Sequence, residues 1–116
     1  EKKAKKTLHI LRKQLKESLN KKFYNKKIII AYEPVWSIGS GKTPKLYDLK
    51  KIVNFIKSEY KKIYKNKNLP KILYGGSVNK KNINLFSTIK EIDGFLIGGA
   101  SQTSKNFIDI IKNYYK

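Results

Sequence analysis

The chain has 116 residues, and its 27 lysine and arginine residues outnumber 8 acidic ones, which gives a formal charge of +19 at pH 7. It has no cysteine, which excludes disulfides and thiolate metal sites, and no apolar run approaches the roughly 18 residues of a membrane helix. Every basic residue except Arg12 is lysine. Asn, Ile and Tyr are also abundant, and like lysine they are encoded by A- and T-rich codons. A codon bias that places lysine on solvent-exposed faces therefore explains the charge better than a nucleic-acid surface, for which arginine is preferred.

The first predicted element is an amphipathic helix from about Ala4 to Lys22. Leucines recur at steps of three and four residues, and lysines fill the opposite face. The only histidine, His9, lies beside the leucine stripe, and we expect it at the surface or boundary. A polar turn follows at residues 21–27.

The next segment combines a short strand with a predicted lid. The apolar run 28–31 predicts a buried strand, which ends abruptly at Glu33 and Pro34. A rigid segment, a tip containing Gly39 and Gly41 and a polar exit then follow, as in a hinged lid. A carboxylate at a strand end beneath a lid suggests catalysis, although position alone also fits a surface pair with lysine.

Two further strands with helices complete the predicted elements. The pattern predicts a helix over 46–63 that ends in the polar run 65–68, because Pro70 prevents its continuation. After it we expect a strand at 72–74, a weaker helix over 83–89, a strand at 94–97 and a closing helix with apolar residues from Phe107 to Tyr115. Strands that alternate with helices predict parallel α/β units. We see no domain boundary and interpret residues 1–116 as part of one domain.

Glycine pairs follow the second and third predicted strands, in YGGS at 74–77 and in GGAS at 98–101. Glycine lets backbone N–H groups approach an oxyanion, so two such turns on neighbouring strands could form a phosphate cradle. Either pair alone fits a tight turn equally well. The residues Gly41, Lys42 and Thr43 end like a P-loop, but Trp36 occupies the position of its first glycine, which excludes that motif.

Taken together, these motifs resemble the triosephosphate isomerase family. AYEPVW followed by IGSGKT is similar to the family's usual AYEPVWAIGTGKT, with Ser37 and Ser40 as the departures, and YGGSV and GFLIGGAS follow in the family's order. KKAKKTLHILRKQL resembles the helix after the family's fifth strand. The resemblance covers nearly the whole chain and implies an α/β fold: the C-terminal part of a (β/α)8 TIM barrel, from helix five through helix eight. A complete barrel needs about 250 residues, so the N-terminal half is expected to be absent.

The resemblance also implies function. The complete chain would be a triose-phosphate isomerase of glycolysis and gluconeogenesis, with Glu33 as catalytic base and no metal or other cofactor. Backbone N–H groups of four residues would hold the phosphate: Gly39, Ser77, Gly98 and Gly99. The lid and the residues that desolvate the base would be Pro34, Val35, Trp36, Ile38, Lys42, Thr43 and Leu96. The family's electrophilic histidine and its substrate-binding asparagine and lysine belong to earlier strands.

Expectations about partners follow from the same resemblance. The expected substrate is a small triose phosphate. The complete protein is expected to be a homodimer in the cytoplasm or, alternatively, in a plastid or other organelle. Neither a specific nucleic acid nor a membrane is expected as a partner. The 116 residues alone are expected to be inactive. One alternative is a degenerate barrel fragment that binds phosphate or polyanions without catalysis, and another is a barrel enzyme with a different substrate.

A third departure from the family lies beyond the lid. The residue after KT is usually alanine, whose N–H pairs with the hydroxyl of the YGGS tyrosine when the lid is closed. Here it is Pro44, which has no N–H, so the contact from Tyr74 is in doubt. We expect Thr43 and Pro44 to begin the next helix early, as N-cap and first helical residue.

Overall fold

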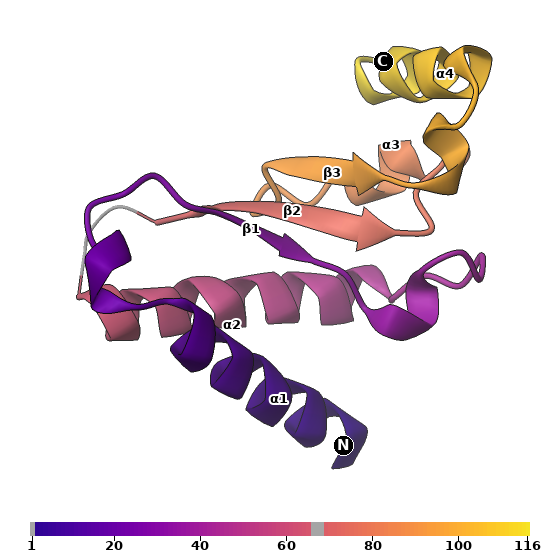
Figure 1. Cartoon of the computed structure of the whole chain (residues 1–116). Coiled ribbons are helices and arrows are strands. Elements are labelled where there is room, and N and C mark those ends of the chain that lie inside the picture. Colours follow the sequence, from indigo (N-terminus) through magenta and orange to yellow (C-terminus); the bar gives the residue numbers. More distant parts are fainter. Residues whose placement is uncertain (1, 66–68) are drawn as a thin grey trace.

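The computed structural model describes residues 2–65 and 69–116, within which strands alternate with helices (Figure 1). The elements in chain order are α1 (Lys2–Ser18), β1 (Ile29–Tyr32), α2 (Leu46–Tyr64), β2 (Lys71–Gly76), α3 (Ile83–Phe86), β3 (Gly94–Ile97) and α4 (Ser104–Tyr114). The predicted α/β fold and the order of its elements are therefore confirmed.

The three strands form one parallel sheet in the order β1-β2-β3. Tyr32 is in register with Tyr74, which is in register with Phe95. Because parallel strands all end at the same edge, the loops that follow β1, β2 and β3 leave from one side of the sheet (Figure 1). These loops are the segments in which the sequence predicted chemistry.

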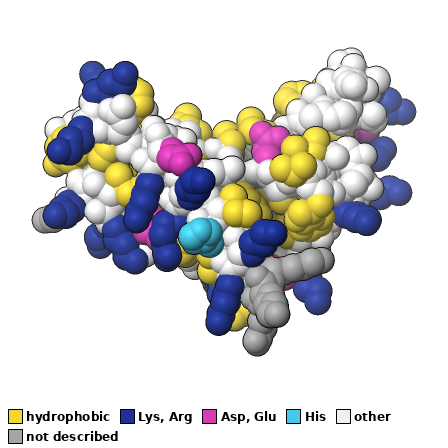
Figure 2. Space-filling model, turned by 60° about the horizontal axis from the view of Figure 1, so that its bottom comes forward, with side chains coloured by type: hydrophobic (Ala, Val, Ile, Leu, Met, Phe, Trp, Pro, Cys, Tyr) yellow, Lys and Arg dark blue, Asp and Glu magenta, His cyan; other side chains and the backbone are white. Residues whose placement is uncertain are grey.

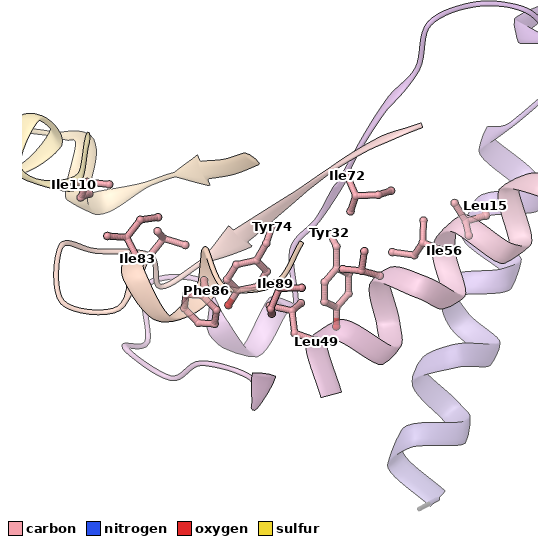
Figure 3. Packing of buried hydrophobic residues seen from close by; sticks show 12 residues of the cluster. Leu15, Tyr32, Leu49, Ile56, Ile72, Tyr74, Ile83, Phe86, Ile89 and Ile110 are labelled. Atoms are coloured by element: carbon pink, nitrogen blue, oxygen red, sulfur yellow. The ribbon is translucent and has the colours of Figure 1, made fainter. Parts of the chain in front are cut away.

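The core lies between the sheet and its helices (Figure 3). Alternate residues of β2, Ile72 and Tyr74, are fully buried, and the Tyr74 ring packs against Phe86 of α3 with centroids 5.0 Å apart. Arg12 of α1 forms an ion pair with Glu59 of α2, whose side chain is 5% exposed. This pair links the two helices through residues that are 47 positions apart in sequence.

The opposite face of the sheet is open. Ile29 of β1 is 65% exposed and Leu96 of β3 is 39% exposed. The prediction that the first strand is buried is therefore wrong for β1 in this chain. A continuous apolar run is typical of a parallel strand that is covered on both faces. In this chain helices cover only one face of the three strands, so the side chains on the other face stay exposed.

Several predicted boundaries also differ, and α3 ends at Phe86 rather than near residue 89. The first helix ends at Ser18 rather than near Lys22, because the side chain of Asn20 caps a separate 3-10 turn at Lys21–Phe23. The second strand extends through Gly75 and Gly76, since both glycines pair with β3. Helix α2 begins at Leu46 with Lys45 as N-cap, so Thr43 and Pro44 do not start it. The predicted end of this helix in the run 65–68 lies partly outside the described residues.

Lysine and arginine side chains are spread over the face seen in Figure 2 and do not gather in one patch. This distribution agrees with the interpretation that lysine occupies solvated faces. Among the described residues, no helix has both the length and the apolar character needed to cross a membrane.

Candidate functional site

Glu33 is the first residue after β1 and lies at the loop-bearing edge of the sheet. Its side chain lies over Gly75 of β2: an ideal Cβ built at Gly75 would be 2.6 Å from Cγ of Glu33 and 3.2 Å from Cβ of Leu96. Because side chains alternate along a strand, the three residues form a row across the open face of β1, β2 and β3. The fold thus brings Glu33 and Leu96 to either side of one glycine.

The carboxylate of Glu33 is not enclosed in this chain. Glu33 is exposed, and Ile38 on the lid is 54% exposed. The desolvation of Glu33 by Ile38 and Leu96 that the resemblance implies is therefore not present within these three strands. It stays a proposal for a complete barrel.

The predicted lid is a compact loop of residues 34–43. Pro34 is buried and leads into a 3-10 turn at Val35–Ser37, while Gly39 and Gly41 have φ angles of 65° and 76°, which favour glycine. Ser40 Oγ donates to the carbonyl of Trp36 at 2.8 Å and accepts from the N–H of Lys42 at 3.0 Å. These bonds close the tip of the loop on itself, with Thr43 exposed at its exit.

Hydrogen bonds also tie the lid to the end of β2. The N–H of Gly41 donates to Ser77 Oγ at 2.9 Å, and Ser77 Oγ donates to the carbonyl of Ser37 at 2.6 Å. The hydroxyl of Ser37 in turn donates to the carbonyl of Lys42 at 2.7 Å. The lid therefore lies against the YGGS segment, 40 residues away along the chain.

The predicted phosphate-binding residues lie in loops at the same edge. Gly98 and Gly99 are exposed at the end of β3, and a Cβ at either position would meet no atom within 4 Å. Gly39 is on the lid, and the N–H of Ser77 makes a long bond of 3.3 Å to Ser37 Oγ. An incoming phosphate oxygen would have to share or replace that acceptor.

Two residues in the site have roles that sequence reasoning did not assign. In the sequence Gly75 is one residue of a glycine turn, whereas in the fold it makes room for Glu33. In the sequence Ser37 is a departure from a motif, whereas in the fold it is fully buried and within hydrogen-bond range of the lid exit at Lys42 and of Tyr74 on β2. The signal available for Ser37 was the departure itself, a hydroxyl where the motif usually has a methyl group.

The parallel β/α units, with the candidate site residues in loops at the carboxyl edge of the sheet, define part of an α/β barrel. Comparison with known protein families narrows this class of protein. The family model described as triosephosphate isomerase matches residues 1–114 of the chain. The chain belongs to the triosephosphate isomerase family, and the resemblance inferred from its motifs is confirmed.

Individual relatives agree with this assignment. The chain is 43% identical over 114 residues to triosephosphate isomerase of Yarrowia lipolytica, covering 97% of this chain and 46% of the relative. It is 40% identical over 115 residues to that of Rhizobium meliloti, covering 98% and 45%. The crystal structure of the Bartonella henselae enzyme aligns with a TM-score of 0.81 at 33% identity, over 99% of this chain and 46% of that one. The chain thus spans about half the length of the relatives it matches.

Proposed function

We propose that this chain supplies the base, the lid and the phosphate-binding loops of a triosephosphate isomerase that interconverts dihydroxyacetone phosphate and D-glyceraldehyde 3-phosphate. The observation that carries the proposal is the position of Glu33 over Gly75, with Leu96 on the other side of that glycine, next to a lid that is bonded to Ser77. The complete enzyme would act on this small-molecule substrate as a homodimer.

Glu33 acts as the base in this mechanism. Isomerisation moves one proton between two adjacent carbons and another between the oxygens they carry. The carboxylate takes the carbon-bound proton beside the carbonyl and leaves an enediolate, and the hydroxyl proton passes to the former carbonyl oxygen. The resulting carboxylic acid then returns a proton to the neighbouring carbon. A single carboxylate at the strand end suffices for both transfers, because the acid formed in the first step is the donor in the second.

The loops bind the phosphate and exclude water. Backbone N–H groups of Gly39, Ser77, Gly98 and Gly99 would donate to the phosphate oxygens, which leaves the reacting carbons near Glu33. Closure of residues 34–43 over the substrate would lower the local polarity and protect the enediolate from side reactions.

The remaining polar groups of the reaction must come from elsewhere in a barrel. An electrophile that polarises the carbonyl is needed, and the only histidine of this chain, His9, is exposed on α1. We therefore propose that these 116 residues are inactive alone and become active when the missing strands are supplied.

A hybrid barrel tests this function. The N-terminal part of the Yarrowia lipolytica enzyme that this chain does not match is fused in front of residue 1, and isomerisation is measured in a coupled assay with that enzyme as positive control. Glu33→Asp withdraws the carboxylate by about one methylene, and a misplacement of about 1 Å can cost on the order of a hundredfold in rate. Glu33→Gln removes the base and should abolish turnover.

The outcomes separate the competing functions. Turnover that is unchanged by Glu33→Asp and Glu33→Gln would remove Glu33 from the mechanism. A folded hybrid that binds a phosphate-bearing inhibitor but never isomerises would instead favour the non-catalytic binding module. Circular dichroism confirms that each protein is folded.

A further inference from the structure

Ser37 is fully buried, whereas its neighbours on the lid, Trp36 and Ile38, are exposed. Its hydroxyl has three partners within hydrogen-bond range: the carbonyl of Lys42 at 2.7 Å, the hydroxyl of Tyr74 at 3.4 Å and the N–H of Ser77 at 3.3 Å. A serine hydroxyl has one hydrogen to donate and two lone pairs to accept with. Donation to Lys42 therefore leaves both lone pairs for Tyr74 and Ser77, and Tyr74 is the donor in its pair.

The partner of Ser37 on β2, Tyr74, is fixed independently of the lid. Tyr74 is fully buried in the core against Phe86, so the packing of its ring fixes the position of its hydroxyl. Gly76 has no side chain and so leaves space for the contact between Ser37 and Tyr74. A Cβ at this position would lie 2.6 Å from Ser37 Oγ and 2.8 Å from the Tyr74 hydroxyl. The lid thus meets two hydrogen-bond donors at the end of β2, the hydroxyl of Tyr74 and the N–H of Ser77.

We propose that Ser37 is a positioning residue whose hydroxyl holds the lid against the end of β2. It joins the first turn of the lid to its exit at Lys42 and joins both to Tyr74 and Ser77. The proposal rests on the proposed function in that residues 34–43 act as the lid over Glu33. Alanine at position 37 cannot make these bonds, and Pro44 has no N–H to offer Tyr74 in their place.

The test uses the amide hydrogen of Gly41, which is bonded to Ser77 Oγ and not to Ser37 Oγ. Its exchange with solvent therefore reports release of the lid from β2 rather than the direct loss of its own partner. In Ser37→Ala we expect Gly41 to exchange about threefold to tenfold faster, the effect of losing roughly one net hydrogen bond. Tyr74→Phe should have a smaller effect in the same direction, because its contact is the longest.

Two controls separate lid release from general loosening. Ser40→Ala removes a hydroxyl that bonds only within the lid, to Trp36 and Lys42, and should leave Gly41 exchange within about twofold of wild type. The amide of Ile72, which donates to Asp93 Oδ2 at 2.8 Å in the core strand, should keep its protection in all variants. The double variant Ser37→Ala/Tyr74→Phe should exchange no faster than Ser37→Ala, because the Tyr74 partner is already absent.

Trp36, the only tryptophan, provides a second measurement on the same lid. It is 53% exposed, and quenching of its fluorescence by acrylamide should increase in Ser37→Ala and not in Ser40→Ala. Equal effects of Ser37→Ala and Ser40→Ala, additive effects of Ser37→Ala and Tyr74→Phe, or an unprotected Gly41 amide in the wild-type chain would each overturn the proposal. Neither measurement needs substrate, so absence of isomerase activity would bear on the proposed function alone.

Discussion

The side chain of Glu33 occupies the space that a methyl group on Gly75 would need. An ideal Cβ at Gly75 would come within 2.6 Å of Glu33 Cγ, closer than real Cβ contacts allow. The position of the proposed base is therefore set partly by the absence of a side chain on the neighbouring strand.

We expect Gly75→Ala to displace the Glu33 carboxylate by about 1 Å and to lower kcat/KM of the hybrid barrel on the order of a hundredfold. Gly94→Ala is the matched control on the same face of the sheet, since its Cβ would meet only the flexible end of Leu73 at 2.8 Å. Steady-state kinetics measure both variants. If Gly75→Ala is as active as Gly94→Ala, the close approach does not position the base.

Pro44→Ala tests which group serves as the hydrogen-bond partner of the Tyr74 hydroxyl. The Tyr74 hydroxyl already lies 3.4 Å from Ser37 Oγ, so the N–H gained in this variant should change inhibitor affinity less than twofold. In a Ser37→Ala background the same substitution should recover several-fold in affinity, because the tyrosine then lacks its partner. Calorimetric titration of the hybrid barrel with a phosphate-bearing inhibitor measures the coupling, and equal effects in both backgrounds would contradict it.

The ion pair between Arg12 and Glu59 should stabilise the packing of α1 on α2. Arg12→Leu leaves the nearly buried carboxylate of Glu59 without its partner, and we expect the free energy of unfolding to fall by about 1 to 3 kcal/mol. The exposed neighbour Lys13→Leu is the control. Because Arg12→Leu/Glu59→Leu also removes the buried carboxylate, this double variant should recover much of the loss in urea denaturation. A double variant less stable than Arg12→Leu would contradict this account.

Burial raises the pKa of Tyr74 above the usual value of about 10. The pKa of Tyr32 is also raised, first by burial and then by the charge of the neighbouring Tyr74 phenolate. The folded state therefore favours the protonated phenols. This contribution to stability is fully present below about pH 10 and is lost as pH rises through the higher pKa values of the folded state. Tyr74→Phe should reduce the alkaline loss of stability, whereas the 75% exposed Tyr47→Phe should not. Thermal melts across alkaline pH with both variants measure this.

The free edges of β1 and β3 should make the isolated chain associate. Unpaired strand edges recruit other strands, and a groove of about 690 Å³ runs beside β1 between Leu15, Ile30 and Ile56. Ile29→Lys places a charge on the 65% exposed residue of this edge and should reduce association. Tyr47→Lys changes an even more exposed residue away from the sheet and should not. Sedimentation velocity distinguishes them, and a monomeric wild-type chain that unfolds cooperatively would show that three strands form a self-sufficient unit.

The sequence by itself determined the order of strands and helices, the location of the loops and the family. Apolar periodicity, glycine and proline are local signals, so the elements could be predicted with errors of a few residues at their ends. The motif around Glu33 identified the proposed base because contiguous residues carried the resemblance. The end of β2 was placed too early, because pairing of Gly75 and Gly76 with β3 depends on the neighbouring strand and not on glycine's own preference.

Only the tertiary structure decided which residues support the site. Ser37 meets Tyr74 and Ser77 across separations of 37 and 40 residues, and Gly75 meets Glu33 across the sheet. No local pattern reports such distances, because they depend on strand register and on the path of the lid. The same reason explains the open face at Ile29: an apolar run shows that a strand can be buried, whereas the elements packed around it decide whether it is.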